Sequence, residues 1–475
     1  MDKPGNSKKI VWYNLAFMAF STVWGFGNVL NGYIFFNGIQ VIFSWILMFA
    51  LYFVPYALMV GELGSAFKNS GGGVSSWIHE TISPKMAYYA GWTYWACHVT
   101  YIASKGSGGL KALSWMVFQN GETYATFDTK LVQFATLGVL LFFCWVASRG
   151  LNPLKKLATI AGTSMFVMSI LYIVMMFAAP AINPNGGYLS MDFSWKNLIP
   201  QFNVGYFTSL SILVFAVGGC EKISPYVNKV ENPSKGFPKG MIALAIMVMI
   251  CAILGTVAMG MMFDPADIAA NFDSYNANGS YWAFQKLGEN YGMGNILMII
   301  YAACNAIGQF STLVLSIDAP LRMLLDNKDA REFIPTKLLK KNKYGAYING
   351  IWMVAILSGS IILIQALVPN SDVVLRQLTQ LNSVTMPMRY LWVFAAYIAL
   401  RLAKNKFNPE YRFVKNQNIA LIAGGWCFFV TAFCCLFGMY KEGDMFITVL
   451  NVATPVVLTA LGLILPAIKK RETAQ

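Results

Sequence analysis

The sequence contains 475 residues, of which 57% are apolar, 15% are aromatic and only 12% are charged. Soluble globular proteins carry roughly 25% charged residues, so the composition excludes a cytosolic enzyme, a nucleic-acid-binding protein and a disordered chain. The net charge of +14 is instead typical of a membrane protein whose lysines and arginines gather in cytoplasmic loops.

The apolar residues form recurrent stretches of about 20 residues or more, the length that crosses a bilayer as a helix. About twelve spans are predicted, at 10–37, 40–67, 86–118, 130–148, 153–180, 201–222, 241–263, 292–320, 350–369, 374–402, 418–440 and 445–468. The first span is too long for the core of a cleavable signal peptide, so we expect none.

Basic residues predict the orientation of these spans. With the N-terminus inside, roughly 27 of the 35 lysines and arginines fall on the cytoplasmic side and about five outside, while Lys105, Lys111 and Arg389 lie within spans. Such an asymmetry predicts a multi-pass protein of the cell membrane with both termini in the cytoplasm. We expect this membrane to be a bacterial inner or plasma membrane.

The first span is interrupted by Trp24-Gly25-Phe26-Gly27-Asn28. Each glycine weakens a helix by about 1 kcal/mol relative to alanine, so this segment can open the helix. The alternative is a close contact between helices, because small residues let membrane helices approach one another.

The third span carries a polar face. His98, Tyr101, Lys105 and Gly108 follow helical spacing and share one side, with Ser104 adjacent. This face is expected to line a substrate path. As an alternative, Lys105 is the structural partner of a carboxylate such as Glu221 or Glu62.

The sixth span contains a second weak point, from Phe215 through Gly218-Gly219 to Glu221. A carboxylate at or near membrane depth is costly, which makes Glu221 a candidate for function or for a structural network. Two interrupted spans, five helices apart and opposite in direction, are typical of an inverted repeat. Backbone N–H groups freed at such breaks can bind a carboxylate, and freed carbonyls can bind an ammonium.

Spans eight and ten offer weaker candidates. Ser311 and Thr312 could contribute to a sodium site, although such hydroxyls more often bond back to their own helix. Span ten should kink at Pro387, and its polar residues either line a path or make contacts between helices; they are Gln377, Gln380, Asn382, Ser383, Thr385 and Arg389.

Eight cysteines, all in or at the ends of spans, and two histidines show no spacing typical of a metal site or a disulfide framework. We therefore expect no metal and no cofactor.

Three motifs together resemble the amino acid–polyamine–organocation superfamily, and most nearly its bacterial glutamate/GABA-antiporter-like branch of amino acid and biogenic amine exchangers. They are Gly25-Phe26-Gly27, the aromatic-to-glutamate run Phe215–Glu221, and Val230-Glu231-Asn232-Pro233 with Pro238. Glu62 and the glycine-rich segment 71–77 add to the likeness, which covers essentially the whole chain.

The resemblance implies a substrate site at the two breaks. Gly25, Phe26 and Gly27 would present N–H groups to a substrate carboxylate, and carbonyls near Thr22, Val23, Phe215 and Val217 would receive its ammonium. Phe215 and Phe310 match aromatic gate positions. The predicted binding set is Thr22, Val23, Trp24, Gly25, Phe26, Gly27, Tyr101, Ser104, Lys105, Phe215, Ala216, Val217, Gly218 and Phe310, with Phe215, Glu221, Lys105 and His98 in gating or coupling.

Two departures from the family pattern matter. Phe26 replaces the usual small residue between the glycines, and the lysine that some proton-coupled members carry within span five is absent, since Lys155 and Lys156 lie at its cytoplasmic end. The resemblance therefore does not imply that this protein uses the proton-coupling mechanism of those members.

The predicted fold is an all-α polytopic membrane bundle with one domain. Residues 10–180 and 201–402 would form two inverted five-helix repeats, and 418–468 two extra helices. The predicted function is secondary transport of an amino acid by alternating access, as exchange for an amine or another amino acid. Proton- or sodium-coupled uptake is the alternative.

Enzyme and receptor functions fit poorly, because no nucleophile, base or metal set converges within a span and a receptor would not need paired breaks. The expected partners are the lipid bilayer and a small amino acid or amine, without nucleic acid. A homodimer is an open alternative.

Overall fold

A computed structural model describes residues 9–327, 329–367, 385–403, 406–441 and 443–474. The described residues form helices throughout, with two isolated bridges as their only β pairing. The first half contains α1 (Trp12–Val23), α2 (Gly27–Phe35), η1 (Gly38–Gln40), α3 (Val41–Met48), η2 (Phe49–Phe53), α4 (Val54–Ala66), α5 (Val74–Thr81), α6 (Pro84–Phe118), α7 (Glu122–Thr126), α8 (Thr129–Ser148), α9 (Leu151–Ile182) and α10 (Trp195–Leu198).

The second half begins with another broken helix. It contains α11 (Val204–Val217), η3 (Cys220–Lys229), α12 (Pro233–Gly260), α13 (Pro265–Ala270), α14 (Phe272–Asn290), α15 (Ile296–Leu325), α16 (Ala330–Phe333), η4 (Thr336–Leu339), α17 (Ile348–Leu367), α19 (Tyr390–Leu402), α20 (Gln417–Met439), α21 (Met445–Ala460), η6 (Leu461–Leu463) and α22 (Ile464–Ala474).

The described residues include nine helical stretches long and apolar enough to cross a membrane. The broken α1–α2 pair, the 35-residue α6 and the part of span ten that ends as α19 bring the number to the twelve predicted spans. A backbone that bonds to itself along each helix is what a bilayer requires, because lipid offers no hydrogen-bond partners.

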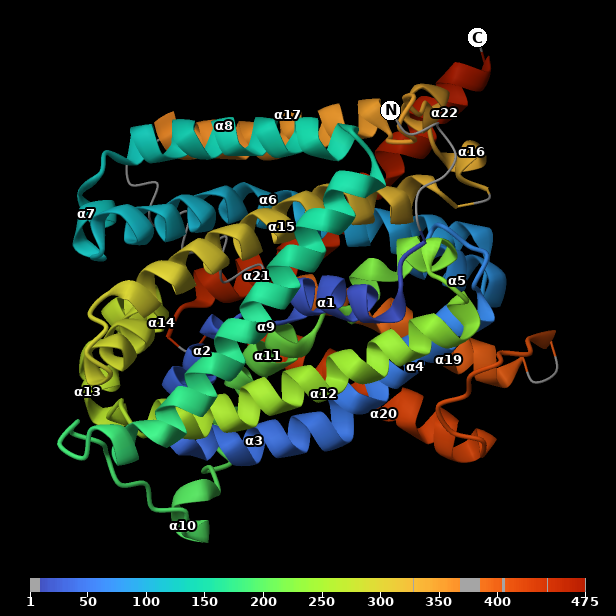
Figure 1. Cartoon of the computed structure of the whole chain (residues 1–475). Coiled ribbons are helices and arrows are strands. Elements are labelled where there is room, and N and C mark those ends of the chain that lie inside the picture. The colour runs from blue at the N-terminus through green and yellow to red at the C-terminus, as the bar shows by residue number, and fades with distance from the viewer. Residues whose placement is uncertain (1–8, 328, 368–384, 404–405, 442, 475) are drawn as a thin grey trace.

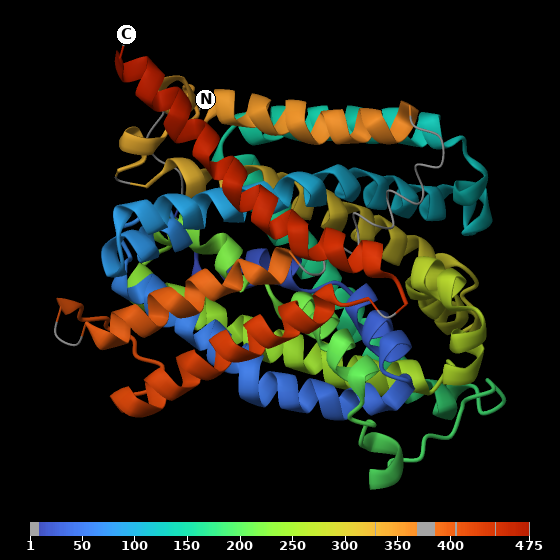
Figure 2. The same cartoon turned by 180° about the vertical axis from the view of Figure 1, so that it is seen from behind.

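The half-helices α1 and α11 lie in the middle of the bundle. Figure 1 shows α9 passing across α1, and both α9 and α12 contact α1. The approach of α9 to α1 requires Gly162, where a Cβ atom would lie 1.8 Å from the carbonyl oxygen of Phe17. The α6 and α15 helices pack along one another, with α8 and α17 outside them (Figure 1). Helices α19–α21 cover the face of the bundle that is turned toward the viewer in Figure 2.

The two ends of the bundle differ. Helices α13 and α14 lie at one end, whereas α5, α16 and α22 lie at the other (Figure 1). The polar segment 264–291, between the predicted spans seven and eight, is mostly helical because it forms α13 and α14. Asp264 caps α13 by accepting from the N–H of Ala266 at 2.9 Å, and Tyr275, Phe284 and Leu287 anchor α14 in the core.

Candidate functional site

The first predicted break is present. Helix α1 ends at Val23, Trp24 is extended (φ −124°, ψ 135°), and α2 begins at Gly27. The backbone N–H groups of Gly25, Phe26 and Gly27 have no hydrogen-bond partner among the described residues. They are the kind of free donors that a helix N-terminus offers to an anion.

The second predicted break is also present. Helix α11 ends at Val217, and the chain turns through Gly218 and Gly219 before η3. Gly219 has φ +105°, which a side chain would disfavour. A Cβ atom at Gly218 would lie 2.1 Å from the hydroxyl of Tyr390, so this turn packs directly on the first residue of α19.

A cavity of about 390 Å³ lies between the two breaks, α6, α14 and α15. Ten residues of the predicted binding set line it: Thr22, Val23, Trp24, Gly25, Gly27, Tyr101, Lys105, Phe215, Ala216 and Gly218. The structure thus brings together both breaks and the polar face of the third span. A volume of this size accommodates one small amino acid.

Four cationic side chains line this cavity, and no carboxylate of the described residues does. Lys105 lies 4.8 Å above the ring of Tyr101, and its Nζ is 3.4 Å from Oε1 of Gln309. The buried Lys222 donates to the hydroxyl of Ser316 at 2.6 Å. Neither lysine has a carboxylate partner among the described residues.

The other two cations lie at different depths. Lys111 donates to the carbonyl of Ala277 in α14 at 2.6 Å, at the end of the cavity that α14 covers. Arg389 lies deep, with Nε 3.3 Å from Oε1 of Glu221. Positively charged side chains therefore line the cavity from the end that α14 covers to the two helix breaks.

Glu221 and His98 lie behind Arg389 and do not line the cavity. Tyr94 donates to Oε1 of Glu221 at 2.5 Å and Tyr56 donates to Oε2, while Nε2 of His98 is 3.0 Å from the guanidinium of Arg389. The carboxylate partner considered for Lys105 belongs instead to Arg389, and Glu62 pairs with Arg401 at 2.6 Å. Coupling by Glu221 or His98 stays a prediction.

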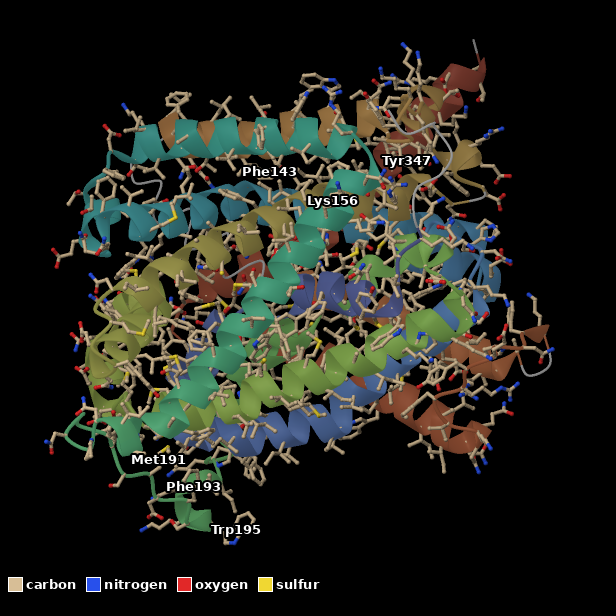
Figure 3. All side chains as sticks on the ribbon, in the orientation of Figure 1. Phe143, Lys156, Met191, Phe193, Trp195 and Tyr347 are labelled. Carbon is tan, nitrogen blue, oxygen red and sulfur yellow. The ribbon has the colours of Figure 1, made fainter. Side chains whose placement is uncertain are left out.

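Four residues of the predicted binding set lie away from the cavity. Phe26 points into an aromatic cluster with Tyr172, Phe284 and Tyr301. Phe310 stacks on Phe143 of α8, with ring centroids 5.0 Å apart, and Figure 3 shows Phe143 on the face of α8 that is turned toward α6.

The remaining two are held by local packing. The hydroxyl of Ser104 donates to the carbonyl of Tyr101 at 2.9 Å, and the side chain of Val217 is fully buried. For these four residues the sequence gives a position beside residues that line the cavity, but it does not give the direction of the side chain.

Several lining residues escaped the sequence analysis. Lys222 is absent from the predicted binding set, although its position directly after Glu221 in the broken span is a usable signal. Helix α14 contributes Asn276, Ala277, Ser280 and Tyr281. Its polar composition resembled a loop, and no periodicity marked it as a cavity wall.

The weaker candidates lie as follows. Thr312 lines the cavity and donates to the carbonyl of Ser21 at 3.0 Å, whereas the buried hydroxyl of Ser311 has no partner among the described residues. Of the span-ten residues, Gln377, Gln380, Asn382 and Ser383 lie outside the described residues. Within the part of the chain that the structure describes, no group of three histidine, cysteine or acidic residues is placed to hold a metal ion.

Hydrogen bonds join the start of the described chain to η3, and η3 to α15. Ile10 pairs with the segment after η3, its N–H donating to the carbonyl of Lys229 and its carbonyl accepting from the N–H of Glu231, both at 2.8 Å. Beside it, Tyr226 and Arg322 both donate to Asp318, at 2.7 and 2.6 Å.

A polytopic bundle with two facing helix breaks around one polar cavity defines a secondary transporter rather than a channel or a soluble binding protein. The chain belongs to the amino acid permease family, which it matches over residues 10–467. The resemblance found in the sequence is thereby confirmed, and the protein is an amino acid transporter.

Three relatives illustrate its position in the family. The aspartate/glutamate permease AcaP of Lactococcus lactis subsp. cremoris is 47% identical over 98% of this chain and 96% of its own length. The inner membrane transporter YjeM of Escherichia coli is 23% identical over 97% and 96%. The probable agmatine/putrescine antiporter AguD of Lactococcus lactis subsp. lactis is 23% identical over 78% and 74%.

Proposed function

We propose that this transporter carries acidic amino acids, aspartate or glutamate. The observation that carries the proposal is the lining of the cavity, to which the described part of the chain contributes four cations and no carboxylate. Uncompensated charge within a membrane protein is costly, and a second substrate carboxylate would compensate it. The high identity to an aspartate/glutamate permease supports the same substrate class.

In the proposed binding mode, the free N–H groups of Gly25 and Gly27 receive the α-carboxylate and carbonyls at the breaks receive the ammonium. Lys105 and Lys222 receive the side-chain carboxylate, because neither is neutralised by a carboxylate among the described residues. Arg389 already has Glu221 as its counter-charge. It contributes to substrate binding through its remaining N–H groups. This mode uses the ability of charged hydrogen bonds to discriminate between substrates of equal size.

The transport mechanism that we propose is alternating access, with residues 10–180 and 201–402 as inverted repeats. We propose that both termini lie in the cytoplasm of a bacterial cell, an orientation supported by the bias of positive charge. In this orientation the end at Ile10 and Asp318 faces inward and α14 covers the outer entrance. Exchange for a second amino acid is the proposed mode. Gradient-driven uptake is the alternative, favoured by the permease name of the 47% identical relative.

The test compares glutamate with glutamine, which has the same shape without the charge. In proteoliposomes, unlabelled glutamate and aspartate should compete with labelled glutamate at least about tenfold better than glutamine. Agmatine should not compete, since it adds positive charge to a cationic cavity. Equal competition by glutamate and glutamine would overturn the proposal.

The same vesicles separate the two transport modes. Dependence of labelled glutamate uptake on an internal amino acid indicates exchange, and vesicles loaded with amines instead test whether an amine can serve as the counter-substrate. Uptake into empty vesicles driven by a proton or sodium gradient indicates the alternative.

A further inference from the structure

A second cationic cavity, of about 210 Å³, lies where α19 is joined to α20. Arg401, Arg412 and Lys415 line it together with Gln417, and none of its lining residues belongs to the substrate cavity. The connection projects from the end of the bundle opposite α14 (Figure 1 and Figure 2). Neither the family assignment nor the proposed substrate gives this cavity a role.

The cavity carries an excess of positive charge. Its one lining carboxylate, Glu62, is already bound, because Oε2 accepts from Arg401 at 2.6 Å and from the N–H of Phe413 at 2.8 Å. Arg412 and Lys415 make no hydrogen bond or ion pair with the described residues. The Nε of Arg401, a residue only 7% exposed, also has no partner among them.

A helix N-terminus adds to this field. Helix α20 begins at Gln417, beside Lys415, and its first turn is capped by Asn416, whose side chain accepts from the N–H groups of Asn418 and Ile419 at 2.9 and 3.2 Å. The N-terminal end of a long helix carries partial positive charge. Cations and helix together favour an anion in this cavity.

The surroundings place the cavity at the border of the membrane. Leu402 of α19 is 61% exposed, and Ile419 and Ile422 of α20 are 54% and 72% exposed. Such apolar surface is covered by lipid in a membrane protein, whereas Arg412 and Lys415 require water or headgroups. An anion bound here would lie at headgroup depth, next to acyl chains.

We propose that this cavity binds a phosphate group, and that its source is the headgroup of an anionic phospholipid such as phosphatidylglycerol. Guanidinium and ammonium groups are well suited to phosphate oxygens, and basic residues at a membrane surface are attracted to anionic lipids. The lipid would fix the α19–α20 connection against α4, which carries Glu62. Inorganic phosphate has the same chemistry and is the other possible source.

The test measures thermal unfolding of the purified full chain in detergent. Soluble short-chain phosphatidylglycerol, short-chain phosphatidylcholine and inorganic phosphate are each added to the wild type, to Arg412→Gln/Lys415→Gln and to a control, Lys340→Gln/Lys343→Gln. The control removes two exposed basic residues from another loop at the same end. Substrate binding should be unchanged in both variants, which shows that they fold.

Phosphatidylglycerol should raise the unfolding temperature of the wild type and the control more than phosphatidylcholine does. The cavity variant should need at least about tenfold more of it for the same shift, equivalent to about 1.4 kcal/mol. An equal response of both variants, or no preference for phosphatidylglycerol, would overturn the proposal. A full response to inorganic phosphate alone would keep the phosphate site but exclude the lipid as its source.

Discussion

The side-chain amide of Asn28 donates to the carbonyl of Ala216 at 3.1 Å and to the carbonyl of Val23 at 3.3 Å. One residue of α2 therefore joins the carbonyl ends of both half-helices, α1 and α11. Thr22 adds a weaker link, with its hydroxyl 3.4 Å from the carbonyl of Gly219. These contacts keep the two breaks opposite one another, which a shared substrate site requires.

Asn28→Ala should weaken substrate binding about five- to 150-fold, because the loss of an amide leaves carbonyls unpaired at a cost of about 1–3 kcal/mol. Asn28→Asp should be worse, since it places a negative charge beside two carbonyls and an anionic substrate. Binding of labelled glutamate to purified protein measures both effects. Wild-type affinity in Asn28→Asp would show that the two breaks do not depend on this residue.

Position 27 tests the approach of the substrate to the backbone. A Cβ atom there would lie 3.5 Å from Oγ of Ser280, an ordinary contact, so alanine fits but a longer side chain extends toward α14. We expect Gly27→Ala to bind within about threefold of the wild type and Gly27→Leu to lose binding while remaining folded. Normal affinity in Gly27→Leu would contradict the assignment of the carboxylate site.

The two predicted aromatic gates should now behave differently. Phe215 lines the cavity, whereas Phe310 packs on Phe143. Phe215→Ala should lower the turnover rate more than the affinity, as expected for a residue that covers the site, and Phe215→Tyr should retain activity. Phe310→Ala should mainly lower the unfolding temperature.

Exchange rates and thermal unfolding, measured on the same preparations, separate these outcomes. An unchanged exchange rate in Phe215→Ala would return Phe215 to a packing role. A slower turnover in Phe310→Ala without loss of stability would restore its role as a gate.

The sequence predicts the backbone of the site better than its side chains. Gly25, Gly27 and Gly218-Gly219 indicate where helices must open, because their effect on helix stability is local. The directions of Phe310 and Lys222 depend on how α15 and η3 are rotated after packing, and helical spacing alone does not contain that information. Lys105 lines the cavity, in agreement with the rule that a lysine within a span requires water or a counter-charge.

Lys105 is the most direct test of the proposed substrate. It lines the cavity without a carboxylate partner among the described residues, held only by Gln309 and the ring of Tyr101. Lys105→Met keeps most of the side-chain volume but removes the charge, so glutamate transport should fall at least about tenfold, or about 1.4 kcal/mol. Lys105→Arg should retain part of the glutamate transport, because it keeps the positive charge. In Lys105→Met, competition by glutamine should be the same as in the wild type. Equal losses for glutamate and glutamine would indicate a structural role for Lys105, and wild-type transport of glutamate would show that another cation binds the side-chain carboxylate.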